Sequence, residues 1–305
     1  MMREHQQPEK EKESHPLEEY AIVGDRQTAA LISLAGSVDW LCFPRFDSEA
    51  CFAALVGDES NGRWCIRPSS EHYEVERRYL PQTLILETVY RTEHGECTVL
   101  DFMPNRSEAP DIVRIVRGRR GSCRLRFQWN PRFGYGLRVP WVRDGKHGIE
   151  AIAGPHMLRL QSSVGLPTTH NIDVVFRIDE GEEHAFILSW YPSYEPEPDQ
   201  VNPTLALKNT KNYWEHWLAS ANADSLERLP ADVRALVERS LVTIKALTSA
   251  PTGGIVAAPT TSLPERFGGS RNWDYRFCWL RDATFSLLAL LSVGYKNEAE
   301  EWLRW

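Results

Sequence analysis

Apolar residues follow different patterns in the two parts of the chain. Between residues 20 and 191, short apolar runs rich in β-branched and aromatic residues alternate with turn residues. Runs of about five to eight residues at about 10–15-residue spacing are typical of an antiparallel sandwich or barrel. Residues 118–121 are expected to form one of the turns. The expected strands cover residues 20–23, 28–34, 37–43, 51–55, 63–67, 73–80, 84–92, 97–102, 112–117, 123–129, 149–152, 157–161, 171–178 and 185–191.

The pattern changes after residues 192–199, where three prolines and three acidic residues predict a linker. Asn202 before Pro203 then has the signature of a helix amino terminus. Apolar residues recur at helical spacing in residues 205–220, 230–247, 283–293 and 297–305. We therefore divide the chain into a disordered tail (1–17), an antiparallel β-sandwich domain (18–191), a linker with a connecting helix (192–229) and an α-helical segment (230–305).

The composition argues against several classes of function. The net charge is −7 and basic residues form no block, so nucleic acid is not an expected partner. Residues 1–16 are almost wholly polar, and no apolar run reaches the ~18 residues of a spanning helix, so neither a secretory signal nor a membrane partner is expected. The six cysteines are scattered, without a CxxC pair or a histidine at ligand spacing. This predicts reduced thiols, no metal site and a cytoplasmic location.

Residues 271–282, which we name the aromatic segment, concentrate the candidate chemistry. They hold four aromatic residues, three arginines and two aspartates. An apolar run of helical length follows, so Arg281 and Asp282 are expected at the first turn of a buried helix. Charges in such a place bind each other or a polar ligand. One interpretation is a structural ion pair. The other is a sugar site, where rings cover the sugar's apolar face while arginine donates to its hydroxyls and aspartate accepts from them.

The run WDYRFCWLRDA at residues 273–283 resembles the first substrate-site segment of glycoside hydrolase family 15, the glucoamylases and bacterial trehalases. Residues 25–31 and 36–47 are similar to the amino-terminal segment of bacterial members. The resemblance implies an antiparallel super-β-sandwich followed by an (α/α)6 barrel, of which residues 230–305 hold only the first helices. The chain is therefore expected to be a truncated part of a longer enzyme, and inactive by itself.

The resemblance also implies a reaction. This is release of glucose from maltooligosaccharides, starch or trehalose by an inverting general acid/general base mechanism. It assigns Arg281 and Asp282 to the hydroxyls of the terminal glucose, and Tyr275 and Trp279 to the lining of that subsite. The family's two catalytic glutamates lie beyond the position that matches Asp282, and no stretch here matches them. No catalytic residue is therefore expected within this chain.

Other polar and aromatic residues receive structural interpretations. Arg45 and Asp47 are expected either to pair locally in a surface turn or to reach over the substrate pocket. Trp273 and Phe277 are expected in the core. A solvated helix face is expected for three acidic residues, Glu298, Glu300 and Glu301.

Three alternatives to this function stay open. A disaccharide phosphorylase of similar architecture would need a phosphate-binding loop beyond Trp305. A non-enzymatic carbohydrate-binding module would need no paired carboxylates. Within the favoured class, the subsite residues present do not separate trehalose from maltooligosaccharides. No cofactor is expected, although phosphate and magnesium dependence remains open for a trehalase-type enzyme, as does homo-oligomer formation.

Overall fold

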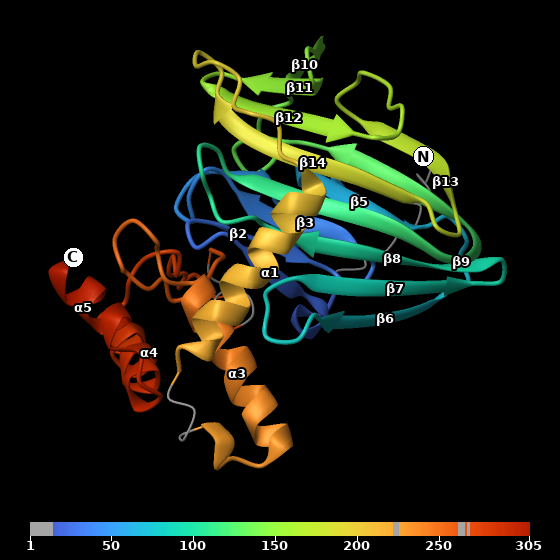
Figure 1. The fold of residues 1–305 in the computed structure, drawn as a ribbon. Coiled ribbons are helices and arrows are strands. Elements are labelled where there is room, and N and C mark those ends of the chain that lie inside the picture. Colours follow the sequence, from blue (N-terminus) through green and yellow to red (C-terminus); the bar gives the residue numbers. More distant parts are fainter. Residues whose placement is uncertain (1–14, 222–225, 262–265, 267–268) are drawn as a thin grey trace, which may run out of the picture.

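The computed structural model describes residues 15–221, 226–261, 266 and 269–305. Of the tail predicted at residues 1–17, residues 1–14 lie outside this described part. The remainder is a system of strands followed by helices that lie to one side of it (Figure 1). No described helix is both long and apolar enough to cross a membrane.

The described strands form one fourteen-stranded system in which neighbouring strands pair antiparallel. They are β1 (Ala21–Gly24), β2 (Ala29–Ile32), β3 (Ser37–Cys42), β4 (Ala50–Phe52), β5 (Arg63–Pro68), β6 (Glu74–Tyr79), β7 (Leu86–Thr92), β8 (Gly95–Phe102), β9 (Asp111–Asn130), β10 (Trp141–Gly145), β11 (Gly148–Ala153), β12 (His156–Ser162), β13 (Ile172–Asp179) and β14 (Glu183–Pro192). Three 3-10 turns accompany them, η1 (Leu17–Glu19), η2 (Ala54–Val56) and η3 (Glu59–Asn61).

Strand β9 joins the two halves of this system. Its first half pairs with β8 and β14, and its second half pairs with β5 and β13. The halves face each other across an apolar core, because Phe186 of β14 contacts both Phe127 of β9, at 4.9 Å between ring centroids, and Phe176 of β13, at 5.5 Å. This is the layered antiparallel arrangement that the short apolar runs predict.

The prediction of a turn at residues 118–121 was wrong, because β9 runs through them without a break. Gly121 lies opposite Gly95 of β8, and the amide of Gly118 donates to the carbonyl oxygen of Glu182. Partners that are distant in sequence therefore satisfy the backbone on both sides of these glycines. Glycine is required at position 118, since a Cβ there would collide with the carbonyl oxygen of Asp179.

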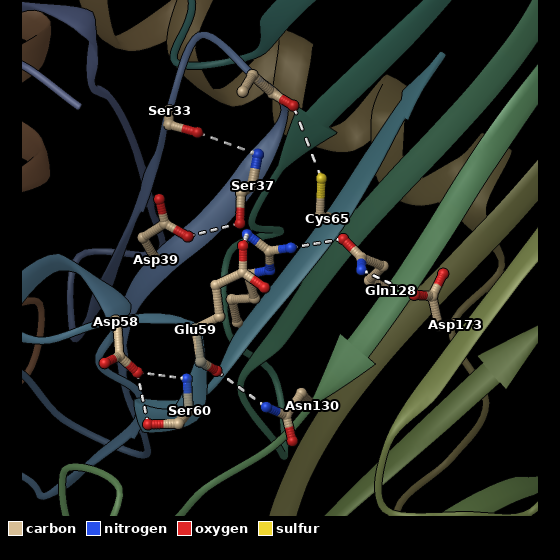
Figure 2. A network of polar contacts seen from close by, with 12 residues as sticks. Ser33, Ser37, Asp39, Asp58, Glu59, Ser60, Cys65, Gln128, Asn130 and Asp173 are labelled. Atoms are coloured by element: carbon tan, nitrogen blue, oxygen red, sulfur yellow. Dashed lines mark hydrogen bonds and ion pairs between the residues drawn. The ribbon is translucent and has the colours of Figure 1, made fainter. Parts of the chain in front are cut away.

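A polar network links side chains of β3, β5, β9 and β13 (Figure 2). Ser37 and Tyr20 donate to the carboxylate of Asp39 at 2.5 and 2.9 Å, and Arg63 bonds Gln128 at 2.6 Å. Burial raises the pKa of Asp39 above its usual value, although both hydroxyl hydrogen bonds oppose the shift. Each of these groups has a protein partner, so the network fastens residues before β1 to the strands and has the character of a structural feature.

Four described helices follow the strands, with bounds close to those expected from apolar spacing. They are α1 (Pro203–Ala219), α3 (Ala231–Ala246), α4 (Leu280–Ser292) and α5 (Lys296–Arg304). Asn202 caps α1 as expected, since its side-chain oxygen accepts from the amide of Leu205 at 3.0 Å. Trp214 and Leu218 of α1 share an apolar cluster with Leu290 of α4. The same cluster includes Leu84, which belongs to the strand-bearing residues 18–191 that we call the β-domain.

The expectation that Glu298 is solvated was wrong. Its side chain is buried in α5 and accepts from the Nζ of Lys245 in α3 at 2.9 Å and from the Nε1 of Trp217 in α1 at 2.8 Å. Tyr295 stacks on Trp217 at 4.5 Å between ring centroids. Since burying a carboxylate requires a partner charge and hydrogen bonds, this contact is built from three helices at once.

Candidate functional site

The aromatic segment pairs with residues 256–261 and continues into the first turn of α4. The amides of Ala258 and Ala257 donate to the carbonyl oxygens of Tyr275 and Phe277 at 2.9 and 3.1 Å. Isolated bridges pair Val256 with Cys278 and Thr261 with Asp274. Backbone hydrogen bonds and isolated bridges therefore hold the two pieces of chain together.

The structure brings together the rings of Tyr275 and Trp279, two residues that were predicted to line the sugar site. The rings of Tyr275 and Trp279 lie 5.4 Å apart between centroids, with their planes at 49°. Trp273 meets the edge of Trp279 at 6.3 Å, and the indole Nε1 of Trp279 donates to the carbonyl oxygen of Asp274 at 3.3 Å. These contacts set the orientation of Trp279, and they group the rings of Trp273, Tyr275 and Trp279 together.

The prediction that Trp273 and Phe277 belong to the core was wrong. They are 46% and 51% exposed. The side chain of this segment that enters the protein is the cation between them, Arg276, which is 7% exposed. The backbone bends at Arg276 and Phe277, so the buried cation and the exposed ring that follow each other in sequence lie in different surroundings.

Arg281 and Asp282 form the expected pair, but at an accessible helix start. Their closest atoms, Nη2 and Oδ2, are 3.2 Å apart, and the two side chains are 70% and 35% exposed. The buried helix expected after them is also wrong, since Phe285 and Leu288 of α4 are exposed and only Ala283 and Leu290 are buried. Among the described residues, no element covers that face of α4. The pair therefore has donor and acceptor positions available to a ligand.

Arg276 is the site residue that the sequence reasoning missed. Its Nε and Nη2 donate to the carboxylate of Asp274 at 2.7–3.2 Å. Burial opposes ionisation of Asp274, but the hydrogen bonds and charge of Arg276 outweigh burial, and the pKa of Asp274 falls below its usual range. The Asp-x-Arg spacing in WDYR is the signal that could have indicated this pair.

The loop at residues 43–49 takes part in the site through its backbone. Nη1 of Arg276 donates to the carbonyl oxygen of Ser48 at 2.7 Å. Arg45 and Asp47 pair with each other, with contacts of 2.8 Å, and are part of an exposed turn as one of the two interpretations expected. Sequence reasoning singled out this loop because of the charged side chains of Arg45 and Asp47, whereas the groups that contact Arg276 are backbone carbonyl oxygens.

A cavity of about 300 Å³ lies elsewhere, between the end of β14 and the linker. Trp190, Tyr191 and Glu197 are among its lining residues, and none of the predicted sugar-site residues lines it. Within the described part of the chain, no group of histidine, cysteine, aspartate or glutamate side chains could hold a metal ion.

Two family models match this chain, one in the strand-bearing part and one in the helical part. The family model described as "Trehalase-like, N-terminal" matches residues 8–166, and the model described as "Glycosyl hydrolases family 15" matches residues 231–305.

Curated relatives match nearly the whole chain. Proteins called trehalase from Mycolicibacterium smegmatis and Mycobacterium tuberculosis are each 34% identical over 317 residues, covering 94% of this chain and 46% and 45% of their own. A trehalase from Thermoplasma volcanium is 31% identical and covers 95% of this chain and 47% of its own. The chain thus spans about half the length of the curated relatives it matches.

The fold is similar to that of a bacterial glucoamylase whose crystal structure contains acarbose. The two structures superpose with a TM-score of 0.66 at 13% identity, over 96% of this chain and 50% of the glucoamylase. At this identity the likeness establishes the fold. The family model that matches more than half of the chain shows that the chain belongs to the family with a trehalase-like amino-terminal domain, and its helical part, residues 231–305, matches the model of glycoside hydrolase family 15.

Proposed function

We propose that the complete protein of which this chain is a part hydrolyses α-glucosidic bonds, and that trehalose is its first substrate to test. The observation that carries this proposal is the match to proteins called trehalase over 94–95% of this chain, through both the strands and the helices. The accessible Arg281–Asp282 pair, which follows the paired rings of Tyr275 and Trp279 in the chain, supports the same class of reaction.

In this proposal, Arg281 and Asp282 hold the terminal glucose. The guanidinium donates to sugar hydroxyls and the carboxylate accepts from them, and charge-assisted hydrogen bonds of this kind give strength and direction. The rings of Tyr275 and Trp279 cover the apolar face of the sugar. An exposed pair can exchange part of its mutual contact for a ligand, which a buried structural pair could not do without a large penalty.

The reaction needs two further carboxyl groups, which we assign to the remainder of the enzyme. An inverting glycosidase places a general acid and a general base ~6.5–9.5 Å apart, so that water attacks from the face opposite the leaving group. The acid must have a raised pKa, whereas the pKa of Asp274 in the aromatic segment is lowered. We therefore propose that both catalytic glutamates come from later loops of an (α/α)6 barrel that α3, α4 and α5 begin.

The proposal includes a cytoplasmic location and a glucoside as the partner molecule, with neither nucleic acid nor membrane as partner. No cofactor is assigned. Assays with and without phosphate and magnesium test the dependence that a trehalase-type enzyme leaves open, and the mass of the native assembly reports on a homo-oligomer.

The test uses the full-length protein and a panel of trehalose, maltose and maltotriose. Wild type should release glucose. If the mechanism inverts the configuration, proton NMR of trehalose hydrolysis should first show β- and α-glucose in equal amounts, because only the attacked glucose changes its anomeric configuration. Asp282→Ala should keep its circular dichroism spectrum and lose about 10–150-fold in kcat/KM, as expected for one charge-assisted hydrogen bond of roughly 1.5–3 kcal/mol.

Glu300→Gln is the matched control, because Glu300 pairs with Arg304 at 3.1 Å on an exposed helix face. Its kcat/KM should equal that of wild type. Release of glucose 1-phosphate in phosphate buffer would instead identify a phosphorylase, and sugar binding without turnover would identify a binding module. An Asp282→Ala protein that unfolds would favour the structural ion pair.

A further inference from the structure

We propose that Arg276 is a positioning residue that fastens the aromatic segment to the β-domain loop at residues 43–49, so that the β-domain sets the geometry of the sugar site. Its effect on sugar binding rests on the proposed function, whereas its effect on the conformation of the segment does not. Arg276 lies between the proposed sugar-binding residues Tyr275 and Trp279 in the sequence, and its own side chain is buried, with 7% exposed.

The guanidinium of Arg276 is bonded on two sides. Toward its own segment, Nε and Nη2 bind the carboxylate of Asp274, with the shortest contact at 2.7 Å. Toward the β-domain, Nη1 donates to the carbonyl oxygens of Ser48 at 2.7 Å and Phe46 at 3.4 Å. The cation also lies 5.7 Å from the ring centroid of Tyr135, on the loop after β9. One buried side chain thus joins three pieces of chain.

The β-domain partner is itself held in place. Phe46 is 5% exposed, its amide donates to the carbonyl oxygen of Gln27 at 2.8 Å, and its side chain packs in a small cluster with Val256. A second connection runs beside the first, since the indole Nε1 of the fully buried Trp40 donates to the carbonyl oxygen of Pro259 at 2.9 Å. Residues 256–261 in turn bond the aromatic segment, so the segment rests on a rigid support.

Arginine is suited to this position in a way that lysine is not. Its planar fork directs one edge to the Asp274 carboxylate while the remaining nitrogen reaches backbone oxygens, whereas an ammonium is a single point charge. The acceptors on the β-domain are carbonyl groups, which any residue would supply. The dependence on sequence therefore falls on Arg276 and Asp274, which lie on either side of Tyr275 in the chain.

The experiment compares wild type, Arg276→Gln and Arg276→Lys in the full-length protein by hydrogen–deuterium exchange. We expect peptides spanning residues 271–279 to exchange at least about tenfold faster in Arg276→Gln, with an intermediate rate in Arg276→Lys. Peptides of β12 and α1 should be unchanged. Arg304→Gln, which alters an arginine 75% exposed at the other end of the helical region, is the control and should behave as wild type.

The second measurement is the split between KM and kcat on the glucoside that wild type hydrolyses. A displaced subsite should raise KM by about tenfold or more, since a misplacement of ~1 Å can cost about 10²-fold. Arg276→Lys should recover part of this loss, which a change in overall stability alone would not produce. Unchanged exchange at residues 271–279 in both variants would overturn the inference.

The two proposals fail separately. If wild type hydrolyses no glucoside, the proposed function fails while faster exchange in the variants still supports the anchoring role. If exchange rises but KM stays at the wild-type value, Arg276 holds the segment without setting the site, and the inference is overturned. Should Arg276→Gln not fold, Arg276→Lys decides by the same two measurements.

Discussion

Replacing Glu298 with alanine should detach α5 from α1 and α3. Lys245 and Glu298 are 6% and 5% exposed, and their charged atoms are 2.9 Å apart. Trp217 adds a hydrogen bond to the same carboxylate oxygen, and the ammonium lies 5.7 Å from the Trp217 ring centroid. The alanine variant would leave the Lys245 cation buried without its counter-charge.

The size of the effect follows from this geometry. Removing one partner of a buried pair destabilises a fold by about 3–5 kcal/mol, because the remaining charge keeps its desolvation penalty. Replacing both groups with apolar residues removes both penalties. The double variant Lys245→Met/Glu298→Leu should therefore be more stable than Glu298→Ala, and within about 1–2 kcal/mol of wild type.

The assay is urea unfolding of the full-length protein, followed by circular dichroism, with the midpoint shift converted through the slope of the transition. Glu300→Ala is the control on the same helix, where an exposed pair contributes about 0–1 kcal/mol. A Glu298→Ala variant that unfolds at the same midpoint as Glu300→Ala would refute the reasoning, and so would a double variant less stable than the single one.

The pH dependence of this contact gives an independent check. Burial alone would raise the pKa of Glu298, but the bonds from Trp217 and Lys245 outweigh it and leave the pKa below the ordinary 4.5. A carboxyl group with a lowered folded-state pKa stabilises the fold above the unfolded pKa, and this contribution is lost as the pH falls through the folded pKa. The stability difference between wild type and Glu298→Gln should therefore narrow below about pH 4.5.

Two further predictions concern the β-domain. Burial raises the pKa of Asp111 to about 6, so the stability that the protonated carboxyl group contributes is complete below the ordinary pKa of 3.8 and is lost as the pH rises through about 6, a change of about 3 kcal/mol. The variant Asp111→Asn should flatten the pH dependence of the unfolding free energy over this window. An unchanged pH profile would contradict burial of Asp111 as the cause. Gly118→Ala should lower the free energy of unfolding by on the order of 1–3 kcal/mol, because the new Cβ meets the backbone of Asp179. At Gly165 a Cβ enters open space, so Gly165→Ala should be within about 0.5 kcal/mol of wild type in stability. Equal melting temperatures of the two variants would count against the close approach at Gly118.

Elements with strong local patterns were predicted well. The cap at Asn202, the helix after residue 230 and the apolar runs of β3, β7 and β14 depend on neighbours within a few residues of each other. Edge strand β10 was missed, since its exposed side chains, such as Trp141, give no apolar run to detect. Antiparallel pairing of the strands also followed from their spacing.

The candidate site was predicted in part. Arg281 and Asp282 are adjacent in the chain, so their pairing needs no tertiary information, and Tyr275 and Trp279 meet because they are separated by one short stretch. The exposure of Arg281 and Asp282 was predicted incorrectly. The apolar run after Asp282 has the composition of a buried helix, and composition does not record which other elements pack against that helix. Whether these residues bind sugar stays a prediction.

From the sequence came the order of strands before helices, most element bounds, and the residue types that suit a sugar. Tertiary structure alone decided which charges are buried: Arg276 reaches the carbonyl oxygen of Ser48 across 228 positions, and Lys245 reaches Glu298 across 53. The physical reason is that periodicity records which face of an element is apolar, while a charge enters the interior only where counter-charge and hydrogen bonds together satisfy it. WDYR supplies the Asp274 carboxylate for Arg276 but not the Ser48 carbonyl oxygen, and the acidic start of α5 contains neither Lys245 nor Trp217.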